Sequence, residues 1–256
     1  MRYTFDFSGL APYWEMFLSG ALTTLELTLA STVFGLILGI LCAIGRRGPN
    51  RWLSGVCGVY IETVRNTPFL VQIFIFYFGL SSLGYTMPAA VAAVVTMVIN
   101  VGAYSAEIIR AGMDAVPPGQ IEAAECLGLS RARIYWHVVM LPAFEKVYPS
   151  ITSQFVLMML MSSVTSQISA EELTGVANNV QSITFLSLET YIVVAGLYLC
   201  LAVLLKALFW LGGVLLFRRR RVVARAARAT RAAGARARAA ARRQAAAPTV
   251  REIRHG

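Results

Sequence analysis

The second of several long apolar runs contains polar and charged side chains of types that can bind a small polar solute. Residues 60–80 read YIETVRNTPFLVQIFIFYFGL. Ionisable side chains within a membrane usually face a cavity or one another, and a cavity wall that binds a polar solute needs charged and hydrogen-bonding groups. Arg65, Thr67 and Gln72 supply these groups and are candidates for a substrate pathway.

Pro68 lies in the middle of this group. It leaves the carbonyl of Val64 without a helical donor and disfavours helical geometry at Thr67. Backbone opened within a membrane is tolerated where it lines a cavity or is buried in protein. The alternative is that Glu62 and Arg65, spaced i,i+3, pair with each other and only fix helix packing.

A second polar stripe is predicted in the third apolar run. Asn100, Tyr104 and Glu107 lie at i, i+4 and i+7 and therefore share one helical face. Asn100 and Tyr104 either line the pathway or form hydrogen bonds between helices. For Glu107 we favour pairing with Arg110.

The fourth run carries small polar residues that include Ser162 and Ser163. Both are pathway candidates, although small polar residues also serve to pack membrane helices together.

Enzymatic chemistry is not indicated. No span carries two facing carboxylates, a histidine pair or a Ser–His arrangement, and neither the four cysteines nor the two histidines show metal-ligand spacing. No GxxxxGK(S/T) phosphate loop occurs, so the chain is not expected to bind ATP in that mode.

Composition places these residues in a membrane protein. Of 256 residues, 57% are hydrophobic and 14% charged, against about a quarter charged in soluble domains. Runs of about 20 apolar residues span a bilayer as helices. We therefore predict an all-α integral membrane protein with five transmembrane helices, at Phe17–Ile44, Leu53–Leu83, Pro88–Ala111, Pro149–Ser169 and Tyr191–Phe217.

Lysine and arginine bias in the short loops orients the helices. The loops at 81–87 and 170–189 contain no basic residue, whereas those at 45–52 and 112–148 do. We expect an extracytoplasmic N-terminus, in a segment 1–16, and a cytosolic C-terminus. Loop 170–189 is either a short amphipathic segment that faces an extracytoplasmic partner or a solvated connection.

The polar segment 112–148 is predicted to be a cytosolic docking element. Pro117 and Pro118 form a turn, after which QIEAAECLGLSRARIYWHVVM is helix-prone with an interruption at Gly128. Small residues here let a partner backbone approach closely, and docking of a helix in a groove is a common recognition mode.

EAAECLG followed by a hydrophobic stretch and LPA resembles the EAA loop of type I ABC-importer permeases. The resemblance to polar amino-acid permeases extends over residues 17–217, through GALTTLELTLASTVFGLILGILCAIGR, YIETVRNTPFLVQIFIFYFGL and NVGAYSAEIIRAGMDAVPPGQIEAAE. It implies that the loop couples to an ATPase through Glu122, Ala123, Ala124, Gly128, Leu141 and Pro142.

The resemblance also implies partners for a transmembrane domain at 17–217. These are a pair of ATPase subunits, a second permease subunit of the same or a sister chain, and an extracytoplasmic solute-binding protein. ATP and Mg would be bound by the ATPase, and no cofactor is expected on this chain. The alternative is a self-sufficient secondary transporter or channel, which an internal inverted repeat would support, and none is visible.

Two departures from the family pattern stand out. Leu141-Pro142 arrives one residue late, which would turn a continuing helix by about 100°. Leu160 and Met161 stand where many relatives carry Lys-Asp or Gly-Thr before the Thr/Ser-Ser pair, so the preferences of charged-pair relatives do not carry over.

The arginine–alanine tail 218–256 holds the basicity of the chain. It carries +12, and the rest of the chain carries −2. We predict that it is disordered in water and attracted to anionic membrane lipids. Nucleic-acid binding is disfavoured because no aromatic residues are interleaved to stack on bases.

Overall fold

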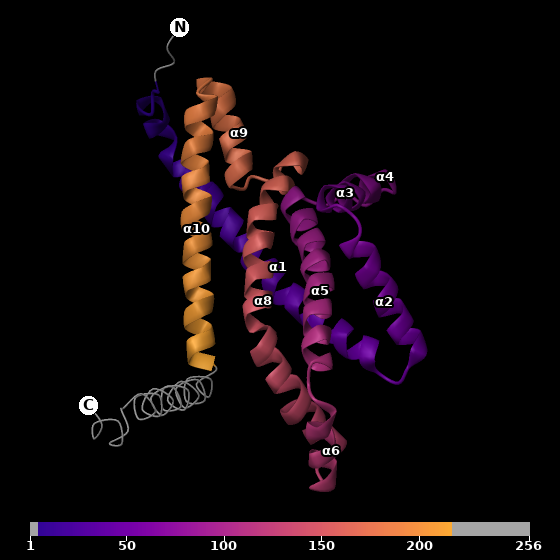
Figure 1. Cartoon of the computed structure of the whole chain (residues 1–256). Coiled ribbons are helices and arrows are strands. Elements are labelled where there is room, and N and C mark those ends of the chain that lie inside the picture. The colour runs from indigo at the N-terminus through magenta and orange to yellow at the C-terminus, as the bar shows by residue number, and fades with distance from the viewer. Residues whose placement is uncertain (1–4, 217–256) are drawn as a thin grey trace, which may run out of the picture. The chain divides into compact units, whose positions relative to one another are not determined.

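The computed structural model describes residues 5–216, and this part of the chain is helical (Figure 1). The described residues belong to two compact units, with the division between Phe209 and Trp210, and the sites discussed below lie in the first unit. The predicted tail at 218–256 lies outside the described residues.

Four helices of the described part are long and apolar enough to cross a membrane: Ser8–Arg47, Ala89–Asp114, Arg131–Ile168 and Ser187–Leu216. They contain α1 (Trp14–Arg47), α5 (Ala89–Asp114), α8 (Leu141–Met161) and α10 (Ser187–Leu216). They correspond to the first, third, fourth and fifth predicted spans.

The second predicted span, Leu53–Leu83, is not one helix. α2 (Arg51–Arg65) ends before Pro68, and α3 (Phe69–Phe74), a π-helical turn (Ile75–Gly79) and α4 (Leu80–Ser82) follow it. Figure 1 shows α3 and α4 turned away from the direction of α2. Proline interrupts the run, as its missing N–H and ring require.

α1 and α5 form the most extensive helix pair of the bundle, and glycines permit it. A Cβ placed on Gly39 would lie 2.6 Å from Cβ of Ser105, and one placed on Gly35 would lie 2.6 Å from Cβ of Val101. Gly35 and Gly39 are four residues apart on one face, the spacing that lets membrane helices approach closely.

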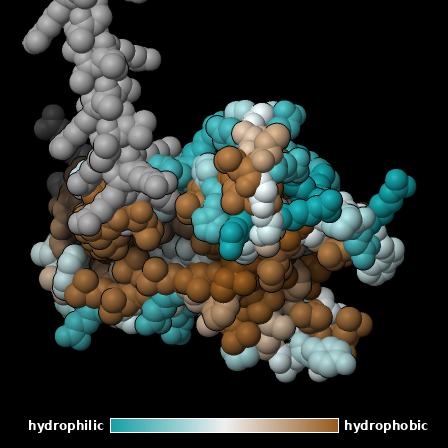
Figure 2. Space-filling view, turned by 90° about the horizontal axis from the view of Figure 1, so that it is seen from below, coloured by the Kyte–Doolittle hydropathy of each residue, from teal (hydrophilic) through white to brown (hydrophobic). Residues whose placement is uncertain are grey.

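The polar segment forms short helices at one end of the bundle, which we call the α6 end. α6 (Pro118–Cys126) leads through Gly128 to α7 (Arg131–Arg133) and a π-helical turn (Ile134–Met140), from which α8 continues. Figure 2, which views the protein from this end, shows hydrophilic side chains gathered beside broad apolar flanks.

Loop 170–189 contains a helix of 12 residues, α9 (Leu173–Thr184), at the opposite end of the bundle. Its buried face packs in a core with α1, α8 and α10. The connection is therefore a short amphipathic helix and not a solvated loop. The buried side chains of α9 are Leu173, Val176, Ala177 and Val180.

Candidate functional site

The break at Pro68 is closed by one side chain. Nε2 of Gln72 donates to the carbonyl of Val64 at 2.7 Å and to that of Thr67 at 2.8 Å. The Val64 oxygen that the sequence predicts to lose its helical donor thus gains a side-chain donor. Such pairing is what buried backbone carbonyls require.

Gln72 also links the broken helix to α5. Its Oε1 accepts from Nδ2 of Asn100 at 3.1 Å, and both residues are buried. The oxygen of the Asn100 amide, Oδ1, is buried and has no hydrogen-bond partner among the described residues. A buried acceptor without a partner is costly, so this group is available to a water or a bound polar group.

A pocket of about 490 Å³ lies beside the break. Its volume falls in the range of small-molecule sites. Thr67 and Gln72 are the two predicted pathway residues in its lining. The lining residues are Tyr60, Thr63, Val64, Thr67, Gln72, Ile75, Phe76 and Ile99.

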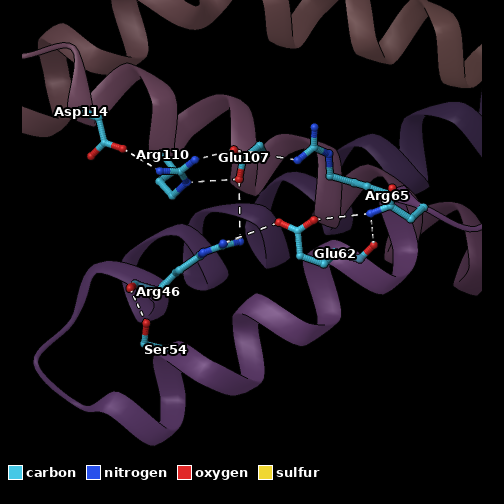
Figure 3. Close-up of polar contacts among 8 residues, drawn as sticks. Arg46, Ser54, Glu62, Arg65, Glu107, Arg110 and Asp114 are labelled. Atoms are coloured by element: carbon cyan, nitrogen blue, oxygen red, sulfur yellow. Dashed lines mark hydrogen bonds and ion pairs between the residues drawn. The ribbon is translucent and has the colours of Figure 1, made fainter.

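A cluster of charged side chains joins α1, α2 and α5 towards the α6 end (Figure 3). Glu107 is its centre: it lies 3.9 Å from Arg46 and from Arg65, and accepts from Nε of Arg110 at 3.2 Å. Arg110 Nη1 also contacts Asp114 at 2.8 Å. One carboxylate therefore connects cations from three helices.

The cluster changes the interpretation of Arg65. Its guanidinium contacts Glu107 and lies 5.7 Å from the ring centre of Tyr104, and it does not line the pocket. Glu62 contacts Arg46 at 3.7 Å instead of pairing with Arg65. The predicted i,i+3 pair is thus replaced by contacts to other helices, whereas the predicted Glu107–Arg110 pair is present.

Arg46 and Asp114 are members of the cluster that the sequence did not single out. Arg46 entered the sequence argument only as a basic loop residue, and it is the last residue but one of α1. Its position at the end of α1, shortly before the apolar run that contains Glu62, was the feature of the sequence that could have indicated an ion pair. Which charged residues of different helices pair depends on how the helices pack.

Ser162 and Ser163 lie in the 3₁₀ helix η4 (Ser162–Ile168), which packs against α3 and α5. Both hydroxyls donate to carbonyls of the preceding turn, those of Met159 at 2.6 Å and Leu160 at 2.8 Å. Neither serine lines the pocket beside Pro68.

The predicted docking residues lie in α6, in the turn at Gly128 that follows it, and at the start of α8, where Leu141 and Pro142 are exposed. The residues Glu122, Ala123 and Gly128 are exposed, whereas Ala124 is buried within the protein. Gly128 has φ +70°, and a Cβ there would meet no atom within 4 Å. Beside it the side chain of Leu127 is 79% exposed.

The π-helical turn Ile134–Met140 offers a physical account of the late Leu141-Pro142 pair. A π turn bonds i to i+5 and takes up one residue more than an α turn. The buried side chains Val139, Met140 and Ala143 still pack in the core that contains α5. A π turn at this position can take up the extra residue locally, without a 100° rotation of the helix that follows.

Comparison with known proteins identifies the class. The family described as "Binding-protein-dependent transport system inner membrane component" matches residues 35–221. The chain belongs to this family, and it is a permease subunit of an ABC importer in the inner membrane, not an enzyme.

Two permeases illustrate the similarity. The octopine transport system permease OccM of Rhizobium radiobacter is 32% identical over 81% of this chain and 90% of its own. The arginine transport system permease ArtQ of Bacillus subtilis is 33% identical over 78% of this chain and 92% of its own.

Solved structures agree. A chain of "an amino acid ABC transporter with histidines" aligns with a TM-score of 0.78 at 36% identity, over 82% of this chain and 99% of its own. A chain of the MetNI methionine ABC transporter has the same fold, with a TM-score of 0.64 at 20% identity over 82% and 98% of the two chains.

Proposed function

We propose that this permease imports polar amino acids or related small solutes. Support comes from relatives named for cystine, octopine and arginine transport. The observation that carries the proposal is the pocket beside the broken helix, with Thr67 and Gln72 in its wall and the unpartnered Asn100 Oδ1 directly behind Gln72. Arg65, Tyr104, Ser162 and Ser163 belong to the surrounding pathway candidates.

The orientation follows from the basic loops. The chain crosses the membrane five times, with α2 to α4 as the interrupted second crossing, the N-terminus outside and the α6 end in the cytosol. Two permease subunits, this chain with itself or a sister, enclose the path. A solute-binding protein delivers substrate at the α9 end.

ATPase coupling is assigned to the exposed turn at the α6 end. Glu122, Ala123 and Gly128 offer a surface of small side chains, Ala124 fixes α6 on the bundle, and Leu141 and Pro142 begin α8 behind it. ATP-driven closure of two ATPase subunits would draw two such turns together and exchange access between the faces. ATP and Mg are bound by the ATPase.

Gly128→Asp tests the docking assignment. The positive φ and the open surface make this position the one where a larger charged side chain would meet a partner and strain the turn. The variant is expected to insert normally, lose ATPase co-purification and lose uptake. Gly119→Asp is the matched control, because Gly119 is exposed on α6 and a Cβ placed there would meet no atom within 4 Å. Normal uptake by Gly128→Asp would overturn the assignment.

Substrate class is tested by uptake in proteoliposomes that contain the permease with its ATPase and binding protein. Labelled arginine, glutamine and cystine are offered singly and in competition. ATP-dependent accumulation of at least one supports the proposal. Accumulation of none, with ATP hydrolysis intact, would place the substrate outside the polar amino acids.

A further inference from the structure

Glu172 is a buried carboxyl group at the α9 end that the transport pathway does not use. It is 0% exposed and precedes α9 directly. Its Oε1 accepts from the backbone N–H groups of Thr174 and Gly175 at 2.9 and 3.0 Å. This is the capping of a helix N-terminus by a side-chain acceptor.

The second carboxyl oxygen joins α9 to two long helices. Glu172 Oε2 accepts from the hydroxyl of Tyr198 on α10 at 2.6 Å and from that of Thr24 on α1 at 3.4 Å. Thr24 Oγ1 in turn accepts from the backbone N–H of Leu173 at 3.2 Å. One side chain therefore holds three helices together.

α9 is bounded by two unusual backbone positions. Ser169 before it and Phe185 after it have φ of 62° and 58°, and among the described residues they are the only ones other than glycine with positive φ. The left-handed region costs a non-glycine residue about 1–2 kcal/mol. Such residues persist only where the surrounding contacts hold them, and they often mark segments that switch.

We propose that Glu172 is a positioning residue that latches α9 onto α1 and α10, and that release of this latch frees α9 as a unit during transport. The inference rests on the proposed function, because it assigns α9 to the gating of the substrate path. The bonds of Glu172 share one carboxyl group, so water that reaches it replaces all of them together. The contacts of α9 then open in one step, and the strained hinges favour that opening.

The test measures access to the buried face of α9. Ala177 is 0% exposed on that face, and Ala177→Cys is introduced after Cys42, Cys57, Cys126 and Cys200 are replaced by alanine. The full-length permease is placed in nanodiscs, where both faces are accessible, and the rate of reaction with a charged maleimide is recorded. Neither orientation nor the ATPase affects this measurement.

Three variants are compared in that background. Glu172→Met keeps the side-chain length but removes every acceptor, and labelling should accelerate about tenfold or more. Glu172→Gln keeps one acceptor oxygen for the helix N-terminus and should fall between this variant and the parent. Glu171→Gln is the matched control, because Glu171 is exposed, and it should label at the parental rate.

A second reporter separates local opening from general unfolding. Met97 lies in α5 and is 0% exposed, so Met97→Cys should stay unlabelled in all variants. Tyr198→Phe removes one donor to Glu172 and should accelerate labelling at Ala177→Cys by a smaller factor. Labelling that is unchanged in both Glu172→Met and Tyr198→Phe would overturn the latch.

Transport provides the last readout. With the ATPase and binding protein present, labelling of Ala177→Cys should accelerate during ATP hydrolysis, and Glu172→Met should hydrolyse more ATP per solute imported. Suppose that Glu172→Met accelerates the labelling of Ala177→Cys without ATP, but that ATP hydrolysis does not change the labelling rate of the parent. Glu172 would then only stabilise the structure, and its role in gating would be overturned. If the permease imports no amino acid, the labelling rates of the variants measured without ATPase remain valid. That result would count against the proposed function alone.

Discussion

Nε2 of Gln72 lies 2.7 Å from the carbonyl oxygen of Val64, the oxygen that Pro68 deprives of its helical donor. The same amide reaches the carbonyl of Thr67 and accepts from Asn100 on α5. A single side chain therefore makes an interrupted helix compatible with a membrane interior, and it places the interruption next to the pocket.

Gln72→Met should destabilise the permease by about 1–3 kcal/mol, because the carbonyls of Val64 and Thr67 lose a side-chain donor and the Asn100 amide loses its acceptor. Uptake should fall with it, since the pocket wall is held by these bonds. Thermal unfolding of the detergent-purified protein measures the loss. Gln167→Met is the control, because Gln167 is exposed in η4; an equal loss in both variants would refute the special role of Gln72.

Local features of the sequence predicted much of the fold. Apolar run length located α1, α5, α8 and α10, and the chemistry of proline located the break after α2. The side-chain donor to the Val64 carbonyl was not predictable from spacing alone. Gln72 follows Val64 by eight residues, and only the turn made at Pro68 brings the two groups together.

The charged cluster shows the same limit. Glu107–Arg110 lies within one helix turn and was predicted from the i,i+3 rule. The contacts of Glu107 with Arg46 and Arg65 join separate helices. The close approach of α1 to α5 at Gly35 and Gly39 brings Arg46 near Glu107, and the packing of α2 on α5 brings Arg65 there. The sequence contained those glycines, but not the register in which they pack.

A double-mutant cycle between Glu107 and Arg65 should give a coupling free energy of about 0.5–1 kcal/mol. The value is small because the two side chains are 22% and 34% exposed and 3.9 Å apart. Glu107→Gln, Arg65→Gln and the double variant are compared by thermal unfolding. Glu15 is exposed at the opposite end of α1, so Glu15→Gln with Arg65→Gln should be additive, and coupling of equal size there would contradict the contact.

Glycines of α1 and α2 should respond to alanine with opposite signs. Gly39→Ala places a Cβ 2.6 Å from Cβ of Ser105 and 3.0 Å from the carbonyl of Gly102, and it should destabilise the α1–α5 pair by about 1–3 kcal/mol. Gly55 lies on α2 with nothing within 4 Å of a Cβ. Gly55→Ala should stabilise the protein by about 0.5–1 kcal/mol because alanine favours helix.

Unfolding midpoints of the two variants against the parent provide the measurement. If the Gly39→Ala protein is as stable as the parent, α1 and α5 can move apart without loss of stability. Their close approach would then not hold the bundle together.

The pH dependence of stability provides an independent test of the setting of Glu172. Burial raises the pKa of its carboxyl above the ordinary value of 4.5, and the bonds from Tyr198, Thr174, Gly175 and Thr24 offset only part of that rise. Tyr198 is the titratable group among these partners. The folded state therefore binds the Glu172 proton more tightly than the unfolded state does.

The sign follows from this difference. The contribution of Glu172 to the free energy of unfolding is fully present below pH 4.5 and is lost as the pH rises through the raised pKa. Glu172→Met cannot ionise, so the stability of the parent relative to this variant should decline as the pH is raised from 4.5 through the raised pKa of Glu172. Exposed Asp6, whose pKa is lowered by its hydrogen bonds from Ser8, acts in the opposite direction and cancels in the comparison. A relative stability that rises across this range would mean that the four donors outweigh burial, and the carboxylate would then hold α9 most tightly when it is charged.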